Sequence, residues 1–329
     1  MKAGLKPALR WRLRRWLGAF PARPPAAPSA PPRRIAYLFA GTFGDFVQML
    51  PALRRLAAAY PQAQILLAGE IDHAREFQGE LPANLRVIPD WVPWTWVLRR
   101  VDLLFTNAVG VYRVRFEAWA RLGARRAFGF RHVQEHRRGA YGESLPLDAG
   151  VKSFAAENLK LLDLAGVPAW AAVSGTDAVA PWGRGIILFH IGSAGLKKDF
   201  GLKAYTRIVL AILSRLKDRP VEVVMGPGDE DIALEVRSGS GQMPQMYPLA
   251  SAIRRLRAFE GTVICFNSFL AHLCHYLGRP ALVIHRGAVP YGYDCAPLHR
   301  QIVLSEDKNW DLGEVWEAVE HSGVRDIPK

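Results

Sequence analysis

Short apolar runs alternate with amphipathic segments along most of this chain, and that alternation limits the folds it can adopt. Residues 34–40 form an apolar run that ends at Gly41, as a strand buried in a parallel sheet does. Residues 46–60 follow with apolar side chains at helical spacing, and Pro51 predicts a bend or a local restart. Further strands are expected at 65–68, 85–88, 101–106, 185–190, 221–225, 262–266 and 281–285, and further helices at 157–164, 204–216, 250–259 and around 272–276. Strands that alternate with helices predict a doubly wound α/β fold.

The alternation stops near residue 165 and begins again near residue 185, which divides the 329 residues into two halves. Each half is long enough to bury its own core. We predict a tail and proline-rich linker over residues 1–32, followed by Rossmann-like domains over 33–172 and 173–329. Ligands of open α/β sheets bind beyond the carboxyl ends of the strands, so the site is expected in a cleft between two facing domains.

The net charge of +13 is concentrated at the N-terminus, where residues 1–34 hold nine Lys and Arg residues and no acidic residue. The rest of the chain keeps only +4, and it contains no zinc-finger spacing, RNP-like aromatic run or basic zipper, so we expect no nucleic-acid partner. Leucines and aromatic residues recur at helical spacing within residues 1–20, which predicts an amphipathic helix on an anionic membrane surface. Its arginines exclude a membrane span. A solvated basic extension is the alternative.

Three cysteines, Cys265, Cys274 and Cys295, are spaced too widely to form a CxxC pair. Their odd number argues against a disulfide framework, and their spacing argues against a structural zinc site. We therefore expect a reducing compartment, the cytoplasm, and no bound metal.

The loop after the first strand, from Gly41 to Asp45, carries the first candidate site. Its sequence GTFGD lacks the Gly-Lys-Ser/Thr ending of a Walker loop and the spacing of a GxGxxG fingerprint. Glycines such as Gly44 permit a tight turn at the start of the following helix. Two roles are open for Asp45: it caps the helix, or it is a general base that takes a proton from an acceptor hydroxyl.

The loop after residues 185–190 reads HIGSAGLKK and contains Gly192, Ser193, Lys197 and Lys198. Its small residues expose backbone N–H groups, and its two lysines supply positive charge for a diphosphate. An ordinary solvated loop is the alternative.

Two further loops follow strands in the second half of the chain. The segment 229–231 reads Asp-Glu-Asp and matches a DxD metal-binding pattern, but a carboxylate that binds a ribose hydroxyl is the better interpretation. The other loop reads NSFLAH, in which Asn267 or Ser268 either caps a helix or binds a ligand. His272 in the same loop is either structural or a ligand contact.

Taken in order, these loops resemble those of glycosyltransferase family 9, the lipopolysaccharide heptosyltransferases, over about residues 34–310. That family has Gly-x-x-Gly-Asp before a helix with an early proline, His-Pro-Gly followed by a lysine near an aromatic, Gly-Gly/Pro…Glu, and Asp-Ser/Thr-Gly-x-x-His before Gly-x-Pro. The matching positions are Gly41, Gly44, Asp45, Pro51, His190, Gly192, Lys198, Phe200, Gly226, Pro227, Glu230, Ser268, His272, Gly278 and Pro280, together with the arginine-rich segment 121–130. Ile191, Asn267 and Phe269 depart from the pattern, which bears on the donor sugar more than on the fold.

The resemblance implies a GT-B fold, in which an N-terminal acceptor domain faces a C-terminal nucleotide-sugar domain across a cleft. It also implies an inverting, metal-independent glycosyltransferase that needs no cofactor. Asp45 would be the general base, and Lys198 would stabilise the departing diphosphate, although the choice between Lys197 and Lys198 stays open. The residues that would bind the donor are Gly44, Gly192, Ser193, Lys197, Glu230, Asn267, Ser268 and His272.

ADP-heptose is the donor that the family implies, and the acceptor would be the lipopolysaccharide core or a similar lipid-linked glycan. The chain would then lie at the inner face of the inner membrane as a peripheral protein. Two alternatives stay open: a GT-B enzyme that uses another nucleotide sugar, and a non-catalytic, membrane-associated binding protein. Asp45 favours an enzyme, whereas Asn267 and Phe269 motivate the binding protein.

Overall fold

A computed structural model describes residues 30–69, 72–88, 100–107, 116, 118–120, 122–131, 143–146, 154–169, 186–226, 228–287, 300–304 and 317. The chain divides into two compact units, residues 1–173 and 174–329. The amphipathic helix expected within residues 1–20 lies outside the described residues, so its membrane contact stays a prediction. None of the helices in the described ranges has the length and apolar sequence that crossing a bilayer requires.

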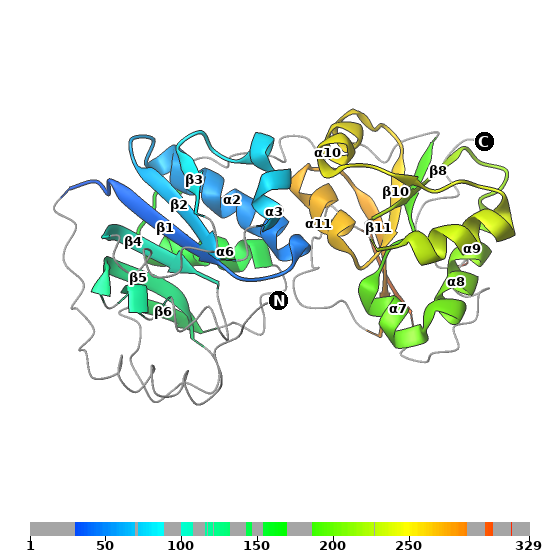
Figure 1. Cartoon of the computed structure of the whole chain (residues 1–329), viewed down its shortest axis with the longest axis horizontal. Coiled ribbons are helices and arrows are strands. Elements are labelled where there is room, and N and C mark those ends of the chain that lie inside the picture. The colour runs from blue at the N-terminus through cyan, green and yellow to red at the C-terminus, as the bar shows by residue number, and fades with distance from the viewer. Residues whose placement is uncertain are drawn as a thin grey trace. The chain divides into compact units, whose positions relative to one another are not determined.

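A parallel sheet forms the centre of the N-terminal unit (Figure 1). Its strands lie in the order β3-β2-β1-β4-β5-β6, which is the strand order of Rossmann folds. The first strand pairs with β2 on one side and β4 on the other, and five of its six residues are buried, as the apolar run predicts. The strands are β1 (Arg34–Phe39), β2 (Gln64–Gly69), β3 (Leu85–Val87), β4 (Val101–Thr106), β5 (Ala124–Arg131) and β6 (Glu143–Pro146).

The C-terminal unit repeats this arrangement with a second parallel sheet, in the order β12-β11-β10-β7-β8-β9. Its central strand β7 pairs with β8 and β10. Counted along the chain within the unit, the order of the six strands is the same as in the first sheet. The strands are β7 (Ile187–His190), β8 (Val221–Met225), β9 (Gln245–Met246), β10 (Thr262–Phe266), β11 (Ala281–Arg286) and β12 (Arg300–Leu304).

Helix α2 (Phe43–Ala59) follows β1 and continues through Pro51 as one element, so of the bend or local restart expected there, the restart does not occur. The loss of one backbone hydrogen bond at the proline is outweighed, because the apolar face of α2 is fully buried. Helix α6 (Phe154–Leu164) lies against α2, and Arg55 of α2 donates a 2.6 Å hydrogen bond to the Val167 carbonyl just beyond α6. Two further helical segments of this unit are α3 (Asp72–Glu76) and the 3-10 turn Gln78–Glu80.

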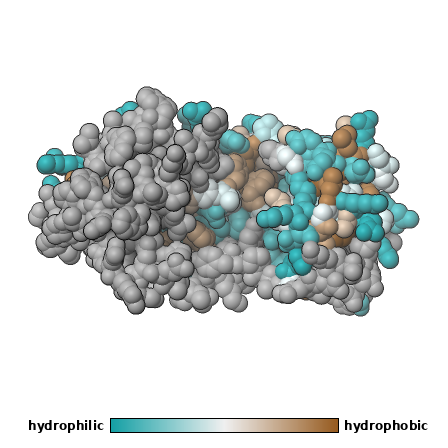
Figure 2. Space-filling model, turned by 60° about the horizontal axis from the view of Figure 1, so that its bottom comes forward, coloured by the Kyte–Doolittle hydropathy of each residue, from teal (hydrophilic) through white to brown (hydrophobic). Residues whose placement is uncertain are grey.

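In the C-terminal unit, helical segments lie between the strands, and those between β7 and β8 and between β8 and β9 bury apolar side chains in the core cluster of the sheet. Tyr205 and Phe266 meet edge-on at 5.2 Å in the middle of this core. The described surface that Figure 2 shows mixes hydrophilic residues with apolar ones. Leu234 of this unit is one of the exposed apolar residues. The helices are α7 (Ala194–Phe200), α8 (Leu202–Arg215), α9 (Glu230–Ser240), α10 (Leu249–Ala258) and α11 (Phe269–Tyr276).

The predicted α/β fold with two doubly wound units is confirmed, and the expected cleft between the domains stays a prediction. Strands β4, β8 and β10 have the predicted bounds, whereas helices begin up to three residues earlier than the apolar periodicity indicates. Strands β5, β6, β9 and β12 were not predicted; the sequence of β5, ARRAFGFR, lies in the arginine-rich segment 121–130 and lacks a continuous apolar run.

Candidate functional site

Each sheet has a switch point beside its central strand, where the chain stops adding strands on one side and continues on the other. The switch points lie between β1 and β4 and between β7 and β10. Loops at the carboxyl ends of the strands diverge there and leave a crevice, which is where α/β proteins of this kind bind ligands. The predicted loops after β1, β7 and β10 all border a switch point, and the loop after β8 is next to one.

Asp45 is the third residue of α2, and its carboxylate caps that helix. Its Oδ2 accepts hydrogen bonds from the Thr42 N–H at 2.7 Å and from the Thr42 hydroxyl at 2.9 Å. Its Oδ1 takes no hydrogen bond from any residue that the structure describes, and the side chain is only partly buried. The capping role considered from the sequence is therefore observed. One carboxylate oxygen is left over for a substrate proton, which keeps the general-base role open.

Asn107 directly follows β4 and faces the Asp45 loop across the first switch point. Its Oδ1 accepts a 3.0 Å hydrogen bond from the Ala40 N–H, at the start of that loop. The side chain is buried, and its Nδ2 makes no hydrogen bond within the described part of the chain. Asn107 thus holds the loop in place and adds a buried N–H donor beside it.

Ser193 joins the loops that follow β7 and β10 in the C-terminal unit. It is the N-cap residue of α7, where its Oγ accepts a hydrogen bond from the Leu196 N–H at 3.4 Å. The same hydroxyl lies 3.1 Å from Oδ1 and 3.2 Å from the backbone oxygen of Asn267. Position 267 therefore supplies a neutral acceptor to a neighbouring loop, which an amide does without adding negative charge.

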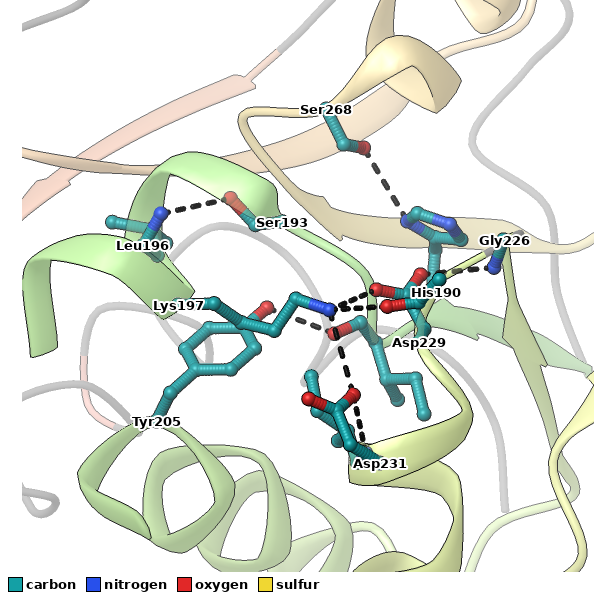
Figure 3. A network of polar contacts seen from close by, with 12 residues as sticks. His190, Ser193, Leu196, Lys197, Tyr205, Gly226, Asp229, Asp231 and Ser268 are labelled. Atoms are coloured by element: carbon teal, nitrogen blue, oxygen red, sulfur yellow. Dashed lines mark hydrogen bonds and ion pairs between the residues drawn. The ribbon is translucent and has the colours of Figure 1, made fainter. Parts of the chain in front are cut away.

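His190, the last residue of β7, is buried between the loops after β8 and β10 (Figure 3). Its Nδ1 lies 3.3 Å from the Ser268 hydroxyl, and its ring meets Phe269 edge-on at 5.8 Å. Burial lowers the pKa of His190 from 6.5 to about 4, against the opposing effect of the Asp229 carboxylate. At neutral pH the imidazole is therefore uncharged, and it packs as a neutral polar group among the loops after β7, β8 and β10.

Lys197 points from α7 into the loop after β8, where its ammonium meets two aspartates (Figure 3). Nζ lies 2.8 Å from Oδ1 of Asp229, 3.5 Å from Oδ1 of Asp231 and 2.7 Å from the Gly228 carbonyl oxygen. Burial by itself would lower the pKa of Lys197, but the hydrogen bond and the charge of Asp229, with a smaller effect of Asp231, raise it. The lysine therefore stays charged at neutral pH.

The other predicted residues are placed less centrally. Lys198 and Glu230 are exposed, whereas His272 is buried within α11. Gly44 is buried at the start of α2. Gly192 is packed so closely against Asp229 that a Cβ atom there would lie 2.0 Å from Oδ2 of that carboxylate.

A cation already occupies the space between the aspartates of the DxD-like segment, because the Lys197 ammonium contacts both Asp229 and Asp231. Within the described ranges, no group of three or more His, Cys, Asp or Glu side chains has the arrangement that a metal ion needs.

A pH titration checks the burial of His190. A histidine whose pKa is lowered in the folded state binds protons preferentially when the chain unfolds, so the free energy of unfolding should fall as the pH drops from 6.5 toward 4. One such group contributes at most about 1.4 kcal/mol per pH unit.

Urea unfolding measured between pH 7 and pH 4.5 should show this slope. His190→Asn should reduce it without abolishing it, because burial also lowers the pKa of His275. Equal slopes in both proteins would mean that His190 is not buried as described.

Three residues of the candidate site have roles that the sequence did not predict. Asp229 lies in the segment 229–231, whose carboxylates were expected to bind a ribose hydroxyl, whereas in the structure it contacts the Lys197 ammonium and the Gly226 N–H. Asn107 has no distinguishing neighbours in the sequence. Tyr205 donates a 2.9 Å hydrogen bond to the Ile191 carbonyl and so supports the loop after β7, but in the sequence it is one apolar residue of an amphipathic helix.

No family model and no curated protein sequence matches this chain. Solved structures do match. The Escherichia coli heptosyltransferase WaaC with ADP is 16% identical with a TM-score of 0.62, over 89% of this chain and 99% of that chain. The E. coli ADP-heptose lps heptosyltransferase II is 16% identical with a TM-score of 0.61, over 90% of this chain and 100% of that one. A family 9 glycosyltransferase from Veillonella parvula DSM 2008 is 16% identical with a TM-score of 0.58, over 90% of both chains. At this identity the likeness shows that the fold is shared along most of the chain.

Proposed function

We propose that this chain is a metal-independent, inverting glycosyltransferase that takes a sugar from a nucleoside diphosphate. ADP-heptose is the first donor to test, because two of the structures with the same fold are ADP-heptose-dependent by their names or were solved with ADP. The acceptor that we propose is a lipid-linked glycan, since the basic amphipathic sequence of residues 1–20 suits an anionic membrane surface.

The proposal rests on one observation: side-chain contacts connect the loops at the carboxyl ends of β7, β8 and β10. Ser193 connects the first loop to Asn267 in the third, and Lys197 connects it to Asp229 in the second. Small residues and the start of α11 leave backbone N–H groups at this edge, and Lys198 adds an exposed positive charge. Such an edge suits the diphosphate of a nucleotide sugar better than it suits a neutral ligand.

Asp45 supplies the group that a transfer reaction needs on the acceptor side. Its Oδ1 would remove the proton from the acceptor hydroxyl while the hydroxyl oxygen attacks the anomeric carbon of the donor. The bond from that carbon to the β-phosphate oxygen breaks at the same time, and the electron pair leaves with the nucleoside diphosphate. Lys198, with Ser193 and Lys197, would stabilise the charge that develops on the diphosphate.

Thermal unfolding of the full-length protein with ADP, UDP and GDP in metal-free buffer tests this function. A ligand at one hundred times its dissociation constant should stabilise the folded state by about 2.7 kcal/mol. Stabilisation by ADP would support an ADP-heptose type of donor. Stabilisation by UDP or GDP alone would move the assignment to another nucleotide sugar on the same fold. If no nucleotide shifts the melting temperature at millimolar concentration, the chain is a binding protein without donor activity.

A further inference from the structure

The Lys197 ammonium contacts three oxygens of the loop after β8, two through hydrogen bonds and one through an ion pair. A lysine ammonium has three donors and no acceptor, and three oxygens of that loop surround it: the Gly228 carbonyl, Oδ1 of Asp229 and Oδ1 of Asp231. The contact with Asp231 is the longest of the three, at 3.5 Å, so a phosphate oxygen that binds Lys197 would replace it most easily.

The two aspartates hold the ammonium very differently. Asp229 has a side chain that is 10% exposed, lies 2.8 Å from Nζ, and accepts the Gly226 N–H with its second oxygen at 3.0 Å. Asp231 has a side chain that is 47% exposed, lies 3.5 Å from Nζ, and uses the same Oδ1 to accept its neighbour's N–H at 2.8 Å. Breaking the contact with Asp229 would leave a buried carboxylate without its cation, which is costly, whereas Asp231 can turn toward water.

We propose that Asp229 is a positioning residue that holds the Lys197 ammonium for the donor diphosphate, and that a phosphate oxygen takes the place of Asp231 on that ammonium. The inference rests on the proposed function and deepens it, because it assigns opposite roles to two acidic residues of one loop. Asp229 stays bound when the donor binds, and its second oxygen continues to accept the Gly226 N–H. Asp231 competes with the donor.

These roles give opposite signs for two matched substitutions. Asp229→Asn frees Lys197 from its buried partner, so the affinity for a nucleoside diphosphate should fall by about tenfold or more, the effect of losing a charge-assisted hydrogen bond. Asp231→Asn removes a competing charge at the surface, so the affinity should rise by about threefold. Simple charge repulsion predicts a gain for both variants, and general damage to the loop predicts a loss for both.

The experiment is isothermal titration of the full-length protein with ADP, UDP and GDP and with their monophosphates, in metal-free buffer at low salt. Asp229→Asn should weaken the diphosphate far more than the monophosphate, because it acts through Lys197, whereas a merely structural defect weakens both equally. In a Lys197→Met background, Asp231→Asn should no longer raise the affinity. That second test holds even if Asp229→Asn does not fold.

The possible results distinguish a failure of the proposed function from a failure of the roles inferred for the two aspartates. A wild-type protein that binds none of the three diphosphates refutes the proposed function and this inference with it. If the wild type binds one of them but both aspartate variants shift its affinity in the same direction, the proposed function stands and the inference is wrong. A gain from Asp231→Asn that persists without Lys197 would also overturn it.

Discussion

Replacing Asp45 with asparagine should slow sugar transfer by about 10²- to 10⁴-fold, the usual contribution of a general base. The amide oxygen of asparagine can still accept the Thr42 N–H, which the carboxylate now accepts at 2.7 Å, so the cap of α2 should survive. An amide has no basicity, so it cannot take the acceptor proton. Donor turnover, nucleotide affinity and melting temperature should all be measured. Only the turnover rate should fall.

Two companion variants separate the base from the cap. Asp45→Ala removes both roles and should also destabilise the protein by about 0.5–2 kcal/mol, as the loss of a helix cap does. Thr42→Ala removes the side chain of the N-cap residue, with its 2.9 Å contact to Asp45 and its half of the capping box, and should leave most of the rate in place. If Asp45→Asn transfers sugar within tenfold of the wild-type rate, then Asp45 is a capping residue only, and another group must be the base.

Of the single methyl groups that could be added to the candidate site of the C-terminal unit, the one added by Gly192→Ala should be the most damaging. A Cβ atom there would lie 2.0 Å from Oδ2 of Asp229 and 2.9 Å from Cε1 of His190, and both side chains are buried. The carboxylate would have to move and would lose its hydrogen bonds with the Gly226 N–H and the Lys197 ammonium. We expect a loss of about 1–3 kcal/mol in the free energy of unfolding from overpacking. Stabilisation by the nucleoside diphosphate should disappear with it.

Gly195→Ala is the matched control in the same segment. A Cβ atom at Gly195 meets nothing within 4 Å, and the residue lies in the first turns of α7. Alanine there should stabilise the helix by about 0.5–1 kcal/mol. Urea unfolding of the two variants, with and without nucleotide, measures both effects. If Gly192→Ala is as stable as Gly195→Ala and still binds the nucleotide, the position does not require glycine for space.

Much of the fold was predictable because buried parallel strands leave a strong pattern in the sequence. Strands β1, β4, β8 and β10 are mostly apolar runs, interrupted by Asp102 in β4 and Glu222 in β8, and each was expected close to its observed place. The order of the sheets and the position of the switch points come from how the strands pair. Strand β5 shows the limit of the pattern, since three of its eight residues are arginines.

By itself, the sequence determined that the polar loops after β1, β7, β8 and β10 follow strands, which makes them candidate binding loops because α/β sheets bind ligands at that edge. It could not determine which side chains of those loops meet. Lys197 and Lys198 are neighbours in the chain, but successive residues of a helix point about 100° apart, so only the packing of α7 directs Lys197 to Asp229 and leaves Lys198 exposed. The same holds for Asn107, which reaches Ala40 across 67 residues of sequence only because β1 and β4 are adjacent in the sheet.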